Sequence, residues 1–257
     1  MPSLHHFLLA MLAAFFAGAI NSVAGGGTLV SFPALLALGL PSIAANATST
    51  VAIWPGSLGS MWGFRREIRA SAPFFHWQAI PCVMGGLIGA LLLRCTPSGL
   101  FDRLVPFLIL FATGLFTVQG LVQKRLQGVS HGGAPHSAAW VAGAWLAQFG
   151  VGIYGGYFGA GMSIMLLTVL SFMGLKDILT MSALTSFFSF FVNGVASILF
   201  SALHMVMWPY VFGMMAAALL GGYAAARVAH RVSKAMVRRF VIVVGFTIAV
   251  ILFVKLL

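Results

Sequence analysis

Apolar stretches long enough to cross a lipid bilayer recur along the whole sequence, and they constrain its fold more than any other feature. A helix needs about 20 mainly apolar residues to cross a hydrocarbon core of ~30 Å. One such stretch could be a buried helix of a soluble protein, but about eight to ten of them predict a lipid environment. Only 7% of the residues are charged, against roughly 25% in soluble domains. The expected fold class is therefore an all-α polytopic membrane protein.

Two of the expected membrane segments are short, and a glycine cluster precedes each of them. Because about a dozen residues barely cover ~30 Å as helix, each short segment is expected either to cross fully or to form half of a glycine-hinged hairpin that re-enters the membrane. The expected segments are approximately Leu4–Val23, Thr28–Leu40, Ile43–Gly63, Pro73–Leu93, Leu104–Val122, Ala138–Ile153, Ser163–Gly174, Ile178–Phe200, Pro209–Ala226 and Phe240–Val254.

The basic residues predict an orientation. The net charge of +11 would suggest nucleic acid for a soluble protein, but these residues lie in clusters between apolar segments, so topology explains them and no nucleic-acid partner is expected. With the clusters in the cytoplasm, both termini are periplasmic and the polar linker 124–137 is cytoplasmic. The residues then inside are Arg65, Arg66, Arg69, Lys124, Arg125, Lys176, Arg227, Arg231, Lys234, Arg238 and Arg239, and those outside are Arg94, Arg103 and Lys255.

Two stretches of the sequence resemble each other at an offset that drifts from 134 to 137 residues. The first contains Gly18-x6-Gly25-Gly26-Gly27, Gly39-Leu40 and Asn46-Ala47-Thr48-Ser49, and the second contains Gly152-x6-Gly159-Ala160-Gly161, Gly174-Leu175 and Ala183-Leu184-Thr185-Ser186. Such ordered recurrence predicts an internal repeat. Residues 1–123 and 138–257 are expected to form two transmembrane repeats of inverted topology, with the solute site between them.

The glycine clusters and two polar stripes are the candidate binding elements. Glycine lets a ligand approach the backbone closely, and a helix that starts after such a cluster presents free N–H groups to an anion. Tight helix packing through small residues is the competing interpretation. The stripes follow each short segment at helical spacing and could instead bond helix to helix. They comprise Asn46, Thr50, Ser57 and Ser60, and Ser182, Ser186, Ser189 and Asn193.

The rarity of acidic residues argues against cation transport. Glu67, Asp102 and Asp177 are the complete set, and all lie at segment ends or in loops, whereas cation pumps carry carboxylates inside the membrane. Clustered metal ligands and the motifs of serine hydrolases or zinc proteases are absent from the sequence. We therefore expect no enzyme activity, no metal and no cofactor. His76 is the best titratable residue within a segment, and a packing role is its more ordinary explanation.

The block Gly18 to Ser49, with its glycine triplet, Pro33 and Asn-Ala-Thr-Ser, resembles the TauE/SafE family of membrane transporters, and residues 152–186 are a weaker echo. The echo departs from the family pattern at Ala160, Leu167 and Leu184. This resemblance implies transport of a small anion, such as sulfite, thiosulfate, a sulfonate or a small organic acid, across the bacterial inner membrane. It does not select one anion, the direction of transport or a coupling ion.

The leading hypothesis is an alternating-access carrier for a small anionic substrate, embedded in the lipid bilayer. A channel-like anion facilitator and a non-transporting membrane scaffold or assembly protein are the alternatives, and the sequence leaves a homodimer open. The expected substrate-binding residues are Asn21, Gly25, Gly26, Gly27, Thr28, Asn46, Thr48, Ser49, Tyr157, Gly159, Gly161, Ser163, Thr185, Ser186 and Asn193.

Overall fold

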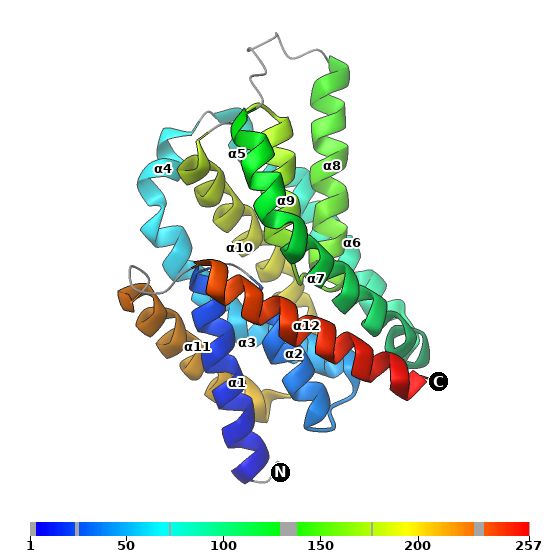
Figure 1. The fold of residues 1–257 in the computed structure, drawn as a ribbon. Helices are drawn as coiled ribbons and strands as arrows, with labels where there is room; N and C mark the ends of the chain where they lie inside the picture. Colours follow the sequence, from blue (N-terminus) through cyan, green and yellow to red (C-terminus); the bar gives the residue numbers. More distant parts are fainter. Residues whose placement is uncertain are drawn as a thin grey trace.

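The computed structural model describes residues 4–23, 26–71, 73–128, 138–175, 177–228 and 234–256, and in these ranges every regular element is a helix (Figure 1). The first half contains α1 (Leu4–Val23), α2 (Thr28–Ala37), α3 (Ser42–Gly63), α4 (Arg65–Ala70), α5 (Pro73–Trp77), α6 (Ala79–Cys95) and α7 (Ser98–Gly128). The second half contains α8 (Ala138–Tyr157), α9 (Met162–Phe172), α10 (Ile178–Ala202), α11 (Trp208–Val228) and α12 (Lys234–Leu256).

Several helices are long and apolar enough to span a membrane. Among the described residues, five stretches meet both conditions: Leu4–Asn21, Phe75–Cys95, Ser98–Val118, Leu179–Ala202 and Met236–Val254. Helices α3, α8 and α11 have 22, 20 and 21 residues, which also suffices for ~30 Å, although they are not among these five stretches. The expectation of an all-α polytopic membrane protein is confirmed.

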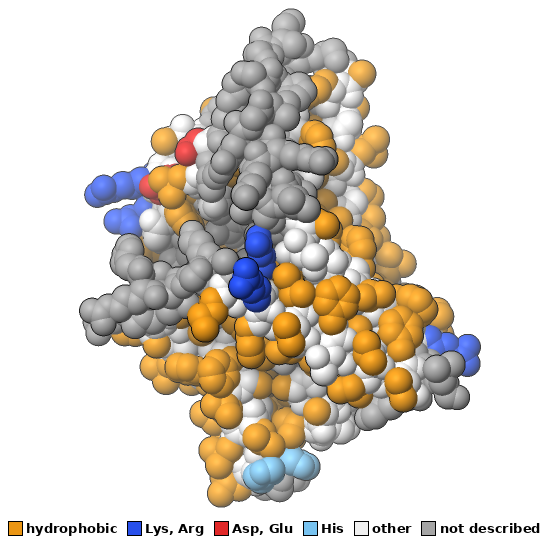
Figure 2. All heavy atoms as spheres, in the orientation of Figure 1, with side chains coloured by type: hydrophobic (Ala, Val, Ile, Leu, Met, Phe, Trp, Pro, Cys, Tyr) orange, Lys and Arg blue, Asp and Glu red, His pale blue; other side chains and the backbone are white. Residues whose placement is uncertain are grey.

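Large apolar side chains on the outer surface are consistent with a lipid environment. Leu146 is 70% exposed, Phe212 68% and Val254 66%, and Figure 2 shows hydrophobic side chains covering much of one face. A soluble monomer rarely exposes so large a contiguous apolar area. In a bilayer these side chains contact acyl chains at no cost.

Two pairs of helices pack backbone against backbone through glycine. A Cβ added to Gly18 of α1 would lie 2.0 Å from the carbonyl oxygen of Ala218 in α11. A Cβ added to Gly152 of α8 would lie 2.1 Å from the carbonyl oxygen of Cys82 in α6. Only glycine permits such an approach, which is how helices associate closely within membranes. In Figure 1, α1 rises from the N-terminus at the bottom, whereas α8 descends from the top.

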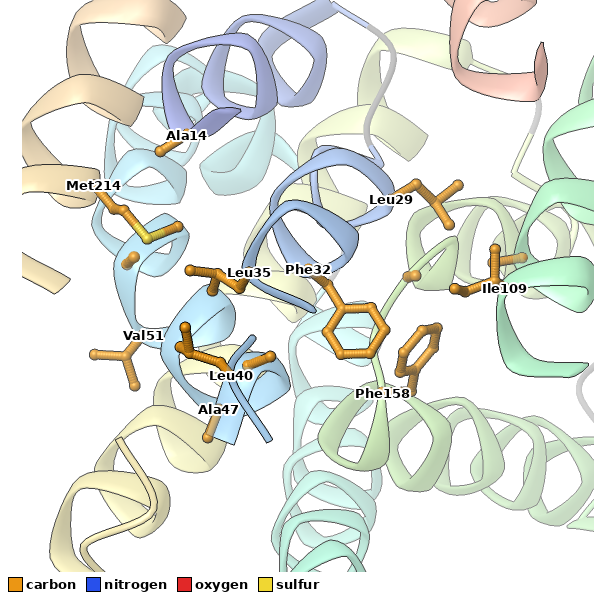
Figure 3. Packing of buried hydrophobic residues seen from close by; sticks show 14 of the residues in the cluster. Ala14, Leu29, Phe32, Leu35, Leu40, Ala47, Val51, Ile109, Phe158 and Met214 are labelled. Atoms are coloured by element: carbon orange, nitrogen blue, oxygen red, sulfur yellow. The ribbon is translucent and has the colours of Figure 1, made fainter. Parts of the chain in front are cut away.

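The short helix α2 meets the turn after α8 at the centre of the molecule. Phe32 and Phe158 are buried, and their rings meet edge to face with centroids 5.3 Å apart, as Figure 3 shows. Edge-to-face pairing adds to the stabilisation that burial of these rings already provides. This contact packs α2 against the turn that precedes α9 in the core.

The structure differs from the expected segments mainly at their ends. Helix α7 continues to Gly128, so the expected linker begins inside a helix and its remainder, 129–137, lies outside the described residues. Helix α4 was not expected as a separate element. The Asp177 carboxylate caps α10 by accepting from the hydroxyl and the N–H of Thr180 at 2.6 and 2.8 Å, and these hydrogen bonds lower its pKa.

Candidate functional site

The first glycine turn links α1 to α2. Gly26 has a φ of +104°, a conformation that residues with a side chain rarely adopt. Its N–H donates to Oδ1 of Asn21 at 3.2 Å, so the last turn of α1 holds the turn in place. Gly27 is the N-cap of α2, and the helix therefore begins directly after the turn.

The second glycine turn links α8 to α9 and uses the same device twice. Gly159 and Gly161 have φ of +77° and +78°, and Gly161 is the N-cap of α9. The hydroxyl of Tyr154 donates to the carbonyl oxygen of Ala160 at 2.6 Å. The turn is thus fixed from the body of α8, as the first turn is fixed from α1.

The two turns face a shared cavity of about 100 Å³. Its described lining comes from both halves of the chain and contains no charged residue, although hydroxyl and amide side chains are abundant. The lining residues are Asn21, Gly26, Thr28, Thr50, Ile53, Trp54, Ser57, Ser60, Phe158, Gly159, Gly161, Met162, Ser163, Thr185, Ser186, Ser189 and Asn193. This central cavity is the candidate site.

Several hydrogen-bonding groups of the lining have no protein partner. Thr28 and Ser163 lie in the first turns of α2 and α9, where a helix leaves its N–H groups without an intrahelical acceptor. The N–H of Ser163 donates to no carbonyl among the described residues. The hydroxyls of Thr185 and Ser189 are buried and also lack partners among the described residues. These residues all line one cavity, and because unpaired buried polar groups are costly, their presence around it favours a polar ligand.

The structure places most of the sequence-predicted binding residues in this lining. Gly25 lies outside the described residues. The predicted residues that line the cavity are Asn21, Gly26, Thr28, Gly159, Gly161, Ser163, Thr185, Ser186 and Asn193, and those that do not are Gly27, Asn46, Thr48, Ser49 and Tyr157.

The predicted residues outside the lining make contacts that support it. Asn46 donates through Nδ2 to the carbonyl oxygen of Tyr157 at 3.0 Å, which ties α3 to the end of α8. The N–H of Met207 donates to the hydroxyl of Thr48 at 2.9 Å. The hydroxyl of Ser49 shares a 2.6 Å hydrogen bond with that of Ser31. Gly27 packs closely on α1, because a Cβ there would lie 2.2 Å from the Ala17 carbonyl oxygen.

Some lining residues are not among the expected substrate-binding residues. Thr50, Ser57, Ser60 and Ser189 belong to the two polar stripes and could have been added from their spacing. Trp54 carries no such signal. Its Nε1 donates to the carbonyl oxygen of Phe190 at 3.0 Å and its ring stacks on the Phe190 ring, so its place depends on how α3 meets α10.

A larger cavity of about 600 Å³ adjoins the central one and shares Asn21, Ile53 and Ser60 with it. A Cβ on any of the lining glycines of α3 would meet nothing within 4 Å. We call this cavity the vestibule. It reaches Phe64, which immediately precedes the basic helix α4. The lining is Gly18, Asn21, Ile53, Gly56, Gly59, Ser60, Gly63, Phe64, Ala218, Leu219, Gly222 and Tyr223.

His76 lies outside both cavities. Its Nε2 is 3.0 Å from the hydroxyl of Ser71 and 2.8 Å from the carbonyl oxygen of Ile68, and its ring packs near Phe187. These contacts match the packing role that the sequence favoured.

Comparison with known proteins gives one consistent result. The family model described as "Sulfite exporter TauE/SafE" matches residues 10–252. A probable membrane transporter protein of Haemophilus influenzae is 30% identical, with 93% of this chain and 92% of the relative aligned. The probable membrane transporter protein ORF9 of a Sinorhizobium species is 27% identical over 97% of this chain and 94% of the relative.

A more distant relative is the probable membrane transporter protein YfcA of Escherichia coli K12, which is 26% identical over 93% of this chain and 85% of the relative. No solved structure matches the chain significantly. The family match covers nearly the whole chain and includes both glycine turns and the cavity between them. This multi-pass membrane protein therefore belongs to the TauE/SafE family of transporters.

Proposed function

We propose that the protein is a secondary transporter of a small oxyanion, which it binds in the central cavity. The observation that carries this proposal is a group of donors around a cavity whose described lining has no charged side chain. The N–H of Ser163 and the hydroxyls of Thr185 and Ser189 have no partner among the described residues, and Thr28 lies at the start of α2. Helix starts attract anions through their free N–H groups and their dipoles. Membership of a transporter family supports the same reading.

The chemistry of the lining favours an anion that must also leave. A buried arginine or lysine would hold an oxyanion tightly, whereas N–H and hydroxyl donors bind it reversibly. A cavity of about 100 Å³ is large enough to hold a small solute. This size suits sulfite, thiosulfate, a small sulfonate or a small organic acid, and the family description itself names sulfite.

We further propose that residues 1–123 and 138–257 are inverted repeats that rock against each other. The matched glycines Gly18 and Gly152 make equivalent backbone contacts, on Ala218 and Cys82. Those two partners are themselves separated by 136 residues, which lies within the 134 to 137 range of the repeat offset. Helix α1 of the first half packs on α11 of the second, and α8 of the second half packs on α6 of the first. This reciprocal packing is consistent with an internal two-fold relation.

The vestibule supports alternating access within this scheme. Its residue Ser60 corresponds, at an offset of 137, to Ser197. Ser197 is 2% exposed, and nearby Phe200 is 1% exposed. The vestibule thus adjoins the central cavity at Ser60, whereas the corresponding position in the other half is packed. We propose that transport exchanges these two arrangements.

Flux measurements on purified protein in proteoliposomes test the function. We expect saturable uptake of sulfite, thiosulfate, a small sulfonate or a small carboxylate, accelerated by unlabelled anion on the opposite side. Non-saturating flux without counter-exchange would indicate a channel-like facilitator. Absence of flux for every one of these anions would leave a scaffold or assembly role and would refute the transporter.

Thr185→Val is expected to weaken substrate recognition without weakening the fold. Valine has nearly the shape of threonine, and the Thr185 hydroxyl has no protein partner among the described residues, so its removal costs little stability. Loss of a hydrogen bond to a charged ligand is expected to raise KM about tenfold. The repeat-related Thr48→Val is the matched control, because Thr48 accepts from Met207 and its loss should lower Tm instead. An unchanged KM in Thr185→Val would contradict the proposed role.

We also propose that the protein lies in the inner membrane with the basic helix α4 on the cytoplasmic side and both termini on the periplasmic side. Cys95 is exposed and Cys82 is buried, and Cys95 adjoins Arg94 on the less basic side. An impermeant thiol reagent is expected to label Cys95 in cells with a permeabilised outer membrane. Arg66→Cys in a Cys95→Ser background should react only after lysis. The reverse pattern would show the opposite orientation.

A further inference from the structure

Two buried glutamines are not explained by the central cavity. The side chains of Gln78 and Gln148 are fully buried, and neither the oxygen nor the nitrogen of either amide has a hydrogen-bond partner among the described residues. Two such amides inside a membrane protein are costly to bury. Their retention calls for a ligand that the packed protein itself does not supply.

Packing contacts place the two amides at one level of the seam between α6 and α8. A Cβ on Gly152 would lie 2.1 Å from the Cys82 carbonyl oxygen, and one on Gly156 would lie 2.0 Å from that of Gly86. The two helices therefore run parallel in this register. Gln78 and Gln148 each lie four residues before this first contact pair, which is one helical turn on the same face. Both residues therefore lie at the same height in the interface between α6 and α8.

Helix α10 connects this part of the α6–α8 seam with the central cavity. The ring of His76 lies 5.8 Å from that of Phe187, and a Cβ on Gly86 would lie 3.0 Å from Val192. Gln78 lies between His76 and Gly86 in the sequence, so the stretch of α10 beside it lies between Phe187 and Val192. Ser189 falls within this stretch, lines the cavity and has a buried hydroxyl without a partner in the described chain.

The corresponding positions in the other half are apolar. The repeat offsets of 134, 136 and 137 relate Gln148 to Ala14, Gln78 to Met214 and Ser189 to Ala52. All of these apolar counterparts are fully buried or nearly so, and Figure 3 shows Ala14 and Met214 within the apolar core. The other half therefore packs with apolar residues at these three positions. Packing alone does not explain why Gln78, Gln148 and Ser189 are polar.

We propose that Gln78 and Gln148 form a second station for the transported oxyanion, reached from the central cavity past Ser189. Their amide N–H groups donate to the anion when the α6–α8–α10 side opens, and the resting amides are left unpaired. This inference rests on the proposed transport function and adds a step to it. The station lies on a side of the cavity different from the vestibule, which is lined by α1, α3 and α11.

Gln78→Leu and Gln148→Leu test the proposal by separating stability from transport. Leucine has a similar volume and leaves no unpaired polar atom, so Tm is expected to stay equal or rise. Turnover of the anion that wild-type protein transports is expected to fall about tenfold or more, as for loss of a hydrogen bond to a charged group. KM should change little, because the central cavity is intact. Met214→Leu, at the counterpart position, should alter neither quantity.

Each other outcome counts against the station. A lower Tm in the leucine variants would show that the amides join α6 to α8 and act as interhelical glue. Wild-type turnover at unchanged Tm would show that the anion does not use them. If wild-type protein transports no anion at all, the proposed function fails and this inference fails with it.

Discussion

Gly161→Val is expected to abolish anion flux while leaving a folded protein. Gly161 has a φ of +78° at the N-cap of α9, and a β-branched residue is a strained outlier there. A Cβ at this position would come no closer than 3.5 Å to any neighbour, so the effect is conformational rather than steric. The strain of about 1–2 kcal/mol or more is expected to shift the turn that places Ser163 at the cavity.

Gly174→Val is the matched control, and flux in proteoliposomes together with Tm is the measurement. Gly174 has a φ of +91° and open space around it, but it lies outside the lining of the central cavity. It should lose similar stability and keep transport. Gly26→Val should also stop flux, yet its Cβ would lie 2.1 Å from the Phe116 ring, so it tests packing as well. Normal flux in both cavity variants, with loss in Arg94→Gln or Arg103→Gln, would show recognition by arginine.

Gly18→Leu and Gly152→Leu are expected to prevent assembly of the folded protein. Each added Cβ would overlap a backbone carbonyl oxygen, of Ala218 at 2.0 Å or of Cys82 at 2.1 Å. A backbone atom cannot move aside as a side chain does, so α1 must separate from α11, or α8 from α6. Overpacking of a core typically costs about 1–3 kcal/mol, and forced separation of a helix pair should exceed that.

Gly143→Leu in α8 is the matched control, because a Cβ there meets nothing within 4 Å. Yield of monodisperse protein and Tm in detergent are the measurements. We expect both to collapse in the seam variants and to remain near wild type in the control. A Gly152→Leu protein with unchanged Tm would show that the two helices do not pack through this glycine.

The spans of the fold were largely predictable, because their signals are local. The length of an apolar run and the glycines or prolines that interrupt it act within a few residues. The first segment was expected at Leu4–Val23, and α1 has those bounds. The second short segment was expected from Ser163, and α9 begins at Met162. Helix α7 ran longer than expected because polar residues at a helix end give no sharp stop.

The candidate site was predictable in part. The glycine turns and the stripe on α10 can be found from spacing, since one face of a helix repeats every three to four residues. The rotation of each helix about its own axis cannot be found from spacing. Asn46 and Thr48 share a helix with Thr50, but the way α3 sits against its neighbours directs them to Tyr157 and Met207 while Thr50 lines the cavity.

By itself, the sequence determined that this chain is a membrane protein, where its helices lie and which glycines end them. These properties depend on the solvent preference and backbone freedom of each residue and its near neighbours. Only the tertiary structure decided that Trp54 borders the cavity and that Gln78 lies at the level of Gln148 in one seam. Residues 70 apart in sequence become neighbours only when glycine contacts fix how two helices pack. That register depends on both surfaces at once, which no local pattern encodes.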